Sequence, residues 1–378
     1  MNVASVAALD GNENFKNSIS GFERLVISNL YNGGTADITD TETINLANLG
    51  FASYVVTSGT LIDNVGGAQS DVLALTKLAA NATVVLTEEG YITAALETAT
   101  GTTDVINVIL DAKDTTLTAN TFTVADVETV KITAEGVFTD ANEDGEDDTA
   151  DVASLTLVAA AAKTITIDGS ADLTLTTTAA NVATIDASAM TGALTYTIDS
   201  AVANIALTSG SGADDITVAT TNNAQVKTGA GADTITVDAD AISANIWGGA
   251  GNDTFDLTST ISSSTQYTTI EDATSGDIIK LATDKFVSGA VSITDFDQMS
   301  LTDKFNAVLT DDTLDVVAGL GSVAAWFQHS GNTYIVVSNG NDTNDLTAGT
   351  ADQAIKLTGL IDLSTGASFN VDGTLEIA

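Results

Sequence analysis

Large apolar residues recur about every tenth position between residues 152 and 257, with small and hydroxyl-bearing residues between them. A strand of about five residues followed by a turn of about five fits this rhythm. Around each apolar centre, apolar and polar residues alternate with the period of two that is typical of a strand. We therefore expect strands centred on the following residues: Leu155, Ile165, Leu173, Ile185, Leu194, Ile205, Ile216, Val226, Ile235, Ile246 and Phe255.

Two such strands and their turns make a coil of roughly 20 residues, which predicts a regular β-solenoid over residues 152–282. Stacked coils bring equivalent residues side by side, so the apolar centres should form inward columns. The threonines beside them should form outward ladders: Thr164, Thr166, Thr174, Thr176, Thr195, Thr197, Thr234 and Thr236.

The pattern is less regular on either side of this stretch. Residues 1–139 read as a β-rich region that either continues the solenoid or stands apart from it, with strands expected at Tyr54–Thr57, Thr83–Thr87, Val105–Leu110 and Thr121–Val124. Ser70–Ala80 has the apolar spacing of a short helix with Ser70 as its cap.

Residues 283–378 should form a C-terminal cap and the region of an export signal. Within it, Leu301–Leu309 and Thr313–Phe327 look helical in part, whereas Thr333–Ser338 and Ala354–Leu360 look like strands. The predicted fold class is all-β: a parallel β-solenoid (β-helix or β-roll) with glycine-rich turns and a cap containing short helices.

Composition adds a strong electrostatic constraint. The chain of 378 residues has 51 acidic and 11 basic side chains, a formal net charge of −40, and neither cysteine nor proline. Such a surface repels nucleic acid and anionic lipid, and it favours a counter-cation. The 44% hydrophobic content and the β patterning argue against disorder.

The first ten residues carry no basic residue and no apolar core of a secretory signal. No apolar run approaches the ~18 residues of a membrane span. We expect no membrane insertion, and a chain that is either cytoplasmic or exported by a route that does not read the N-terminus.

One phrase occurs three times: Ser209–Asp214 (SGSGAD), Thr228–Asp233 (TGAGAD) and Gly248–Asp253 (GGAGND). Each is followed by one residue and then a large apolar one. This is the nonapeptide pattern G-G-x-G-x-D-x-U-x of calcium-loaded β-rolls, in which U is apolar. The three aspartates are 19 and 20 residues apart, so each phrase should occupy the same edge of successive coils.

Calcium prefers six to eight hard oxygen ligands. Glycine turns can direct backbone carbonyls toward an ion, and each aspartate adds a charged ligand. The expected ligand residues are Gly210, Gly212, Asp214, Gly229, Gly231, Asp233, Gly248, Gly249, Gly251 and Asp253. Three turns give two sites, one on either side of Asp233. The alternative interpretation is that Gly and Asp are here only good turn formers.

A closing segment follows, because Thr269–Leu281 contains the phrase I-E-D-A-T-S-G-D-I-I-K-L. Asp272 lies 19 residues after Asp253 and continues the spacing of the aspartates. Asp253 paired with Asp272 or Asp277 could make a third calcium site.

A separate acidic run, D-A-N-E-D-G-E-D-D-T-A-D, covers residues 140–151. Its oxygen-bearing residues fall at the loop positions of EF-hand and dockerin calcium sites: Asp140, Asn142, Asp144, Asp148 and Asp151. Position twelve is Asp rather than the usual bidentate Glu. We expect a calcium loop here, the alternative being a solvated acidic loop.

The three repeats and their closing segment resemble RTX (repeats-in-toxin) proteins exported by type I secretion. The Thr/Ala/Val-rich solenoid, the acidic charge and the absence of Cys and Pro are most similar to the bacterial surface-layer proteins of that group. The motif match covers residues 205–281, and only the third repeat is complete. The resemblance implies several calcium ions, self-assembly, an uncleaved C-terminal export signal and an extracellular location. It also implies an anchor to cell-surface polysaccharide, in a region that we cannot identify in this chain.

The sequence matches the motifs of known catalytic sites poorly. His329 is the only histidine, so the two-histidine zinc site H-E-x-x-H is impossible, and the nucleophile turn G-x-S-x-G is absent. With 51 acidic residues, chance carboxylate pairs are certain and carry no argument. Trp247 and Trp326 are interpreted as packing residues rather than sugar platforms.

The sequence therefore predicts no enzyme. It predicts a structural calcium-binding protein that assembles into a bacterial surface layer, with calcium ordering the solenoid and bridging subunits. The alternative is the stalk of an RTX-type adhesin.

Overall fold

The computed structural model describes most of the chain between Asn2 and Ala378, with gaps that are widest near the N-terminus. The described residues are 2–3, 24–27, 41–47, 51, 53–56, 72–113, 116–136, 151–199, 202, 204–219, 223–238, 243–260, 262–287, 289–291, 295–309, 322–338, 346, 352–364, 367–370 and 372–378. They fall into two compact units, Met1–Thr195 and Tyr196–Ala378.

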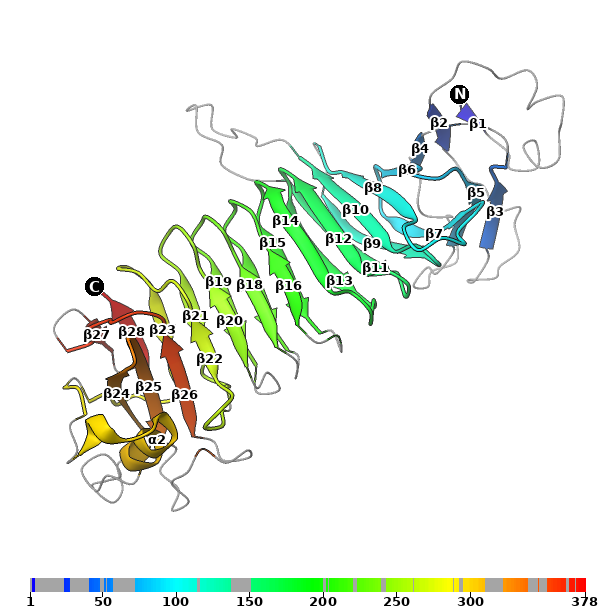
Figure 1. Cartoon of the computed structure of the whole chain (residues 1–378). Coiled ribbons are helices and arrows are strands. Elements are labelled where there is room, and N and C mark those ends of the chain that lie inside the picture. The colour runs from blue at the N-terminus through cyan, green and yellow to red at the C-terminus, as the bar shows by residue number, and fades with distance from the viewer. Residues whose placement is uncertain are drawn as a thin grey trace, which may run out of the picture. The chain divides into compact units, whose positions relative to one another are not determined.

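In the first unit, successive strands alternate between two parallel sheets (Figure 1). One sheet has the order β1 (Asn2–Val3), β2 (Arg24–Ile27), β4 (Ser53–Val56), β6 (Thr83–Leu86), β8 (Val105–Asp111), β10 (Thr129–Glu135), β12 (Thr164–Gly169) and β14 (Thr184–Met190). The other has the order β3 (Thr41–Asn45), β5 (Val72–Leu78), β7 (Gly90–Leu96), β9 (Leu117–Val124), β11 (Val152–Val158) and β13 (Asp172–Thr177). Strands before residue 139 and after residue 151 thus stack in the same two sheets.

The second unit repeats this alternation and then changes to antiparallel pairing. One sheet runs β16 (Ile205–Thr208), β18 (Ala224–Lys227), β20 (Ala244–Trp247), β22 (Thr268–Ile270), β26 (Gln353–Leu357), β25 (Asn332–Ser338) and β24 (Val323–His329). The other runs β17 (Asp215–Val218), β19 (Thr234–Val237), β21 (Thr254–Asp256), β23 (Ile278–Lys280), β28 (Thr374–Ile377) and β27 (Ala367–Phe369). The remaining strand, β15 (Leu194–Ile198), spans the boundary between the units.

The registers explain why these residues form strands. Ile216 pairs with Ile235, Ile235 with Phe255, and Phe255 with Ile279, so one column of apolar side chains runs through four coils. None of the four is exposed to solvent. All eleven predicted centres lie inside strands, and the predicted outward threonines are exposed or half-buried. The all-β class and the parallel β-solenoid are thereby confirmed.

The expected helix at Ser70–Ala80 is wrong, because Val72–Leu78 is strand β5. Its residues pair in parallel with both β3 and β7, which buries Leu73 and Leu75 almost completely. A short isolated helix is marginal in water, so pairing with two neighbouring strands overrides the local apolar spacing.

The C-terminal segment closes the parallel stack of the second unit. Strand β28 pairs antiparallel with β23, and β26 continues the other sheet before the antiparallel strands β25 and β24. The predicted helix at Leu301–Leu309 is confirmed as α2, and it follows the short 3-10 helix η2 (Phe296–Gln298). Thr313–Phe327 was also expected to be helical in part. Its residues from Val323 onward belong to strand β24 and are not helical, whereas residues 313–321 lie outside the described residues.

Aromatic packing holds this helix to the closing strands. The rings of Phe305 and Phe327 lie 5.8 Å apart, and Phe327 stacks on Tyr334 at 5.5 Å. Among the described residues, no helix has both the length and the apolar character needed to cross a membrane.

Candidate functional site

The three glycine-rich phrases form three stacked turns on one edge of the second unit. Ser209–Asp214 joins β16 to β17, Thr228–Asp233 joins β18 to β19, and Gly248–Asp253 joins β20 to β21. Because each flanking strand pairs with its counterpart one coil on, the turns lie in register as well. The structure therefore brings the candidate residues of all three phrases together.

Glycine is required in these turns because adjacent backbones nearly touch. A Cβ on Gly251 would lie 1.6 Å from the carbonyl oxygen of Gly231, and one on Gly231 would lie 2.3 Å from that of Gly212. Gly251 and Gly231 also have φ values of 139° and 141°, which other residues rarely adopt. The first turn differs, since neither Gly210 nor Gly212 has a positive φ.

The aspartates that end the three phrases form a buried column together with Asp277 of the closing segment. Asp214, Asp233, Asp253 and Asp277 are exposed by only 2%, 1%, 1% and 2%. In each step the backbone N–H of one aspartate donates to Oδ1 of the next. The distances are 2.8 Å from Asp214 to Asp233, 3.0 Å from Asp233 to Asp253, and 2.9 Å from Asp253 to Asp277.

The second carboxylate oxygen of the two central aspartates has no partner. Oδ2 of Asp233 and Oδ2 of Asp253 are both buried and accept no hydrogen bond of normal geometry. The Thr228 hydroxyl still interacts with the Asp233 carboxylate and partly opposes the rise in its pKa. A Cβ on Gly248 would lie 2.3 Å from Oδ2 of Asp253, so this oxygen packs directly against the turn backbone. A buried, unpaired carboxylate oxygen is costly, and a cation is one way to satisfy it.

Burial and mutual repulsion weaken the acidity of this column. Desolvation raises the pKa of Asp253 to about 6. The hydrogen bond from the N–H of Asp233 opposes this rise, and the nearby charges of Asp233, Asp277 and Asp272 add to it. Burial also raises the pKa of Asp233 and of Asp272. Without a cation, these carboxylates therefore bind protons more tightly in the folded chain than in the unfolded chain.

Asp272 and Asp277 were the two alternative partners of Asp253 in a third calcium site, and the structure places them differently. Asp277 continues the column, and its Oδ2 accepts hydrogen bonds from the N–H and hydroxyl of Thr274 at 2.7 and 3.2 Å. Asp272 instead accepts from the N–H groups of Gly248 and Gly249 at 3.0 and 2.9 Å. It therefore binds the backbone of the third turn.

One contact at this edge was not anticipated. The hydroxyl of Thr228 donates to the carbonyl oxygen of Gly248 at 2.9 Å and is buried between two turns. Its position equals that of Ser209 and Gly248 in the other phrases. In the sequence, the only sign of this contact is that a hydroxyl-bearing residue stands at Thr228, where the complete repeat has its leading glycine.

The donor atoms on this edge suit a hard cation, but side chains alone do not enclose one. Within the described ranges, no three Asp, Glu, His or Cys side chains converge as a metal cluster. Any ion here must therefore take much of its coordination from turn carbonyls, with one or two carboxylates added. Calcium accepts such mixed oxygen sets.

The other predicted calcium site falls largely outside the described residues. Asp140, Asn142, Asp144 and Asp148 all lie there. The structure includes only Asp151, whose backbone carbonyl accepts a hydrogen bond from the N–H of Asp172 at 2.8 Å. The acidic loop remains a prediction.

Residues considered for other chemistry have packing roles. Trp326 is 3% exposed. The Nζ of Lys227 lies 4.9 Å from the ring centroid of Trp247, over the face that a sugar would need. His329 lies beside Tyr334 at the end of β24, and burial lowers its pKa.

No protein-family model matches this chain. No curated protein matches it either.

Replacing Gly251 by alanine should destabilise the second unit strongly, because the new Cβ would collide with the carbonyl of Gly231. We expect a loss of about 2–5 kcal/mol in unfolding free energy, measured by urea titration with circular dichroism. Gly289→Ala is the control, since a Cβ at Gly289 meets nothing within 4 Å. Equal unfolding midpoints for the two variants would contradict the stacked-turn geometry.

The raised pKa of Asp253, from the usual 3.8 to about 6, predicts a pH dependence in chelator. The folded state binds this proton more tightly than the unfolded state. The stabilisation is therefore complete below the unfolded pKa and is lost as pH rises through about 6.

We expect the metal-free protein to become less stable between about pH 4 and 7. Asp253→Asn, which cannot ionise, should flatten part of this slope in urea titrations at several pH values. A slope as steep in Asp253→Asn as in the parent chain would show that Asp253 is not responsible.

Proposed function

We propose that this chain is a calcium-binding structural protein of the RTX type that assembles into a bacterial extracellular surface layer. The observation that carries the proposal is the column of buried aspartates at stacked glycine turns, with unpaired Oδ2 atoms on Asp233 and Asp253. Turn formation alone explains the glycines. It does not explain why a carboxylate is placed in a dry column with one oxygen unpaired.

Calcium would be held between successive turns by residues of both. One position lies between the turns that end in Asp214 and Asp233, and a second between those that end in Asp233 and Asp253. When bound, calcium supplies positive charge that offsets the repulsion among the aspartates and ties adjacent coils together. The chain's own contribution is to fix the turns in register and to exclude water from the carboxylates.

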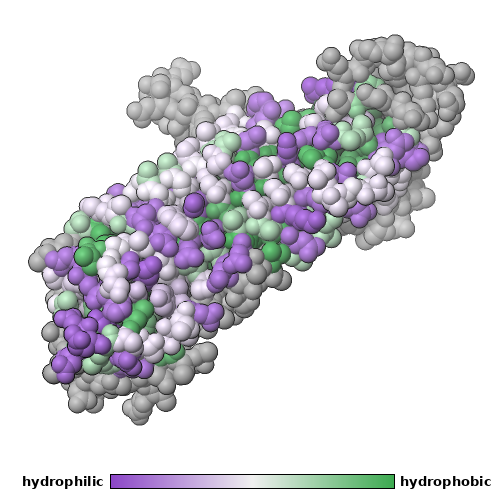
Figure 2. Space-filling view, viewed as in Figure 1, coloured by the Kyte–Doolittle hydropathy of each residue, from purple (hydrophilic) through white to green (hydrophobic). Residues whose placement is uncertain are grey.

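The surface-layer part of the proposal is supported by the net charge, the surface and the resemblance to RTX proteins. A net charge of −40 makes copies of the chain repel one another unless cations lie between them. On the face shown in Figure 2, hydrophilic residues are interspersed with hydrophobic ones. Assembly through calcium-bridged acidic faces suits such a surface. Export by type I secretion follows from the resemblance to RTX proteins.

Calcium affinity should depend most on the central aspartate. Asp233→Asn should weaken calcium binding by about tenfold or more, because Asp233 borders two turn pairs, whereas Asp214→Asn should have a smaller effect. Isothermal titration with calcium measures both. The control is Asp215→Asn, which removes the exposed neighbouring carboxylate. Equal affinities for the Asp233 and Asp214 variants would count against the shared-ion geometry.

Assembly itself distinguishes a surface layer from an adhesin stalk. Negative-stain electron microscopy of the purified chain should show two-dimensional lattices in calcium, which disappear in chelator and return when calcium is restored. The Asp233→Asn variant should need more calcium to form them. Rod-like monomers under all calcium conditions would exclude the surface layer and favour the stalk.

A further inference from the structure

Ser209 opens the first of the three glycine-rich phrases, and its hydroxyl group is buried without a partner. The residue is 3% exposed, and its Oγ forms no hydrogen bond. Burial removes a hydroxyl from water, which is unfavourable unless another group replaces the lost hydrogen bonds. The nonapeptide pattern has glycine at this position, so the pattern itself provides no side chain here.

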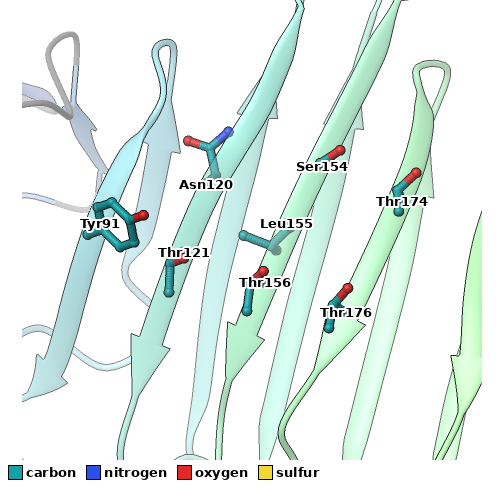
Figure 3. A pocket seen from close by; sticks show the side chains of 8 residues that line it. All are labelled: Tyr91, Asn120, Thr121, Ser154, Leu155, Thr156, Thr174 and Thr176. Carbon is teal, nitrogen blue, oxygen red and sulfur yellow. The ribbon is translucent and has the colours of Figure 1, made fainter. Parts of the chain in front are cut away.

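Hydroxyl groups elsewhere in the chain show two ordinary arrangements. Figure 3 shows the first at an open surface pocket, where Thr156 and Thr176 project from β11 and β13 and are half-buried and exposed. In the second arrangement a buried hydroxyl donates to a nearby carbonyl, as Thr260 does to Leu257 at 3.0 Å. The buried Ser209 hydroxyl has neither solvent nor a carbonyl, so its position calls for a different explanation.

The backbone fixes the place of Ser209 in its turn. The N–H of Ser209 donates to the carbonyl of Lys227 at 2.7 Å, just as the N–H of Thr228 donates to the carbonyl of Trp247 at 3.0 Å. Lys227 and Trp247 are themselves paired in register, one coil apart. Ser209 and Thr228 therefore hold the same place in successive turns, and Gly248 holds it in the third.

A side chain at this place is directed at the aspartate that ends the same turn. In the third turn, a Cβ on Gly248 would lie 2.3 Å from Oδ2 of Asp253. In the second turn, the hydroxyl of Thr228 interacts with the carboxylate of Asp233. By the same register, the leading side chain of the first turn is directed toward the buried carboxylate of Asp214.

Thr228 differs from Ser209 because its hydroxyl already joins two turns. It donates to the carbonyl of Gly248 at 2.9 Å and so ties the second turn to the third. The hydroxyl of Ser209 makes no such bond to the second turn. Its oxygen is therefore still available to a ligand, whereas that of Thr228 is committed.

The backbone also closes the two gaps between turns to different degrees. Between the second and third turns, the N–H of Ala250 donates to the carbonyl of Gly229 at 2.8 Å, and the N–H of Gly231 donates to that of Ala250 at 2.9 Å. At the equivalent place between the first and second turns, the described backbone forms only one such bond, from Ala230 to Gly210 at 3.0 Å. The chain's own hydrogen bonds therefore hold the first and second turns together less completely.

We infer that Oγ of Ser209 is a ligand of the calcium ion held between the first and second turns. A hydroxyl oxygen is a hard, neutral donor like the water oxygens that calcium accepts beside carboxylates and carbonyls. It adds a ligand without adding negative charge to a column of carboxylates that already repel one another. The inference rests on the proposed calcium binding and assigns a side chain that the repeat pattern does not contain.

Calcium titration and thermal unfolding of the full chain test the inference with two alanine variants. Ser209→Ala should weaken one class of calcium sites by about fivefold or more, whereas Ser211→Ala, which removes an exposed hydroxyl from the same turn, should not. In chelator, Ser209→Ala should unfold at the same temperature as the parent or higher, because it removes an unpartnered buried hydroxyl. In calcium it should unfold at a lower temperature. A lower unfolding temperature in both conditions would mean that Ser209 has only a packing role.

Ser209→Cys provides an independent readout, because the chain has no cysteine of its own. A thiolate prefers soft metals to calcium, so this variant should bind cadmium more tightly than the parent and show the ultraviolet absorption of a cadmium–thiolate bond. Ser211→Cys, with an exposed thiol, is the control and should bind cadmium at least about tenfold more weakly.

The outcomes separate this inference from the proposed function. A parent chain that binds no calcium would contradict both. Calcium binding by the parent that is unchanged in Ser209→Ala, or equal cadmium binding by the two cysteine variants, would overturn only the assignment of Ser209.

Discussion

In-register parallel stacking is the constraint on which the structure depends. Once strands repeat at about 4.8 Å, each residue type is placed beside its own equivalent in the next coil. For Ile216, Ile235 and Phe255 this creates a continuous dry core. At the turns it brings the carbonyl of one glycine against the next glycine, so no side chain fits there. For the aspartates it stacks like charges in a buried column. The dry core and the stacked carboxylates therefore have the same origin.

The repeating part of the fold could be predicted from sequence because its signal is also a repeat. Ten-residue spacing located all eleven strand centres, and aspartate spacing located the shared edge. The helix expected at Ser70–Ala80 failed because pairing of β5 with β3 and β7 outweighs local spacing. The spacing of aspartates along the sequence also does not predict which aspartate of the closing segment continues the column. Asp272 keeps the interval of 19, yet the column continues through Asp277, because the closing segment has a longer turn.

The irregular register at Asn120 could not be predicted from sequence. It comes from one extra residue in β9, which does not break the hydrophobic pattern.

The central claim is that a cation completes the aspartate column. Amide hydrogen exchange of the full chain, followed by mass spectrometry in millimolar calcium and in chelator, tests it most directly. The account predicts that calcium slows exchange markedly across residues 205–281, where the turns stack, and much less across residues 83–135. Identical exchange over residues 205–281 in both conditions would contradict it.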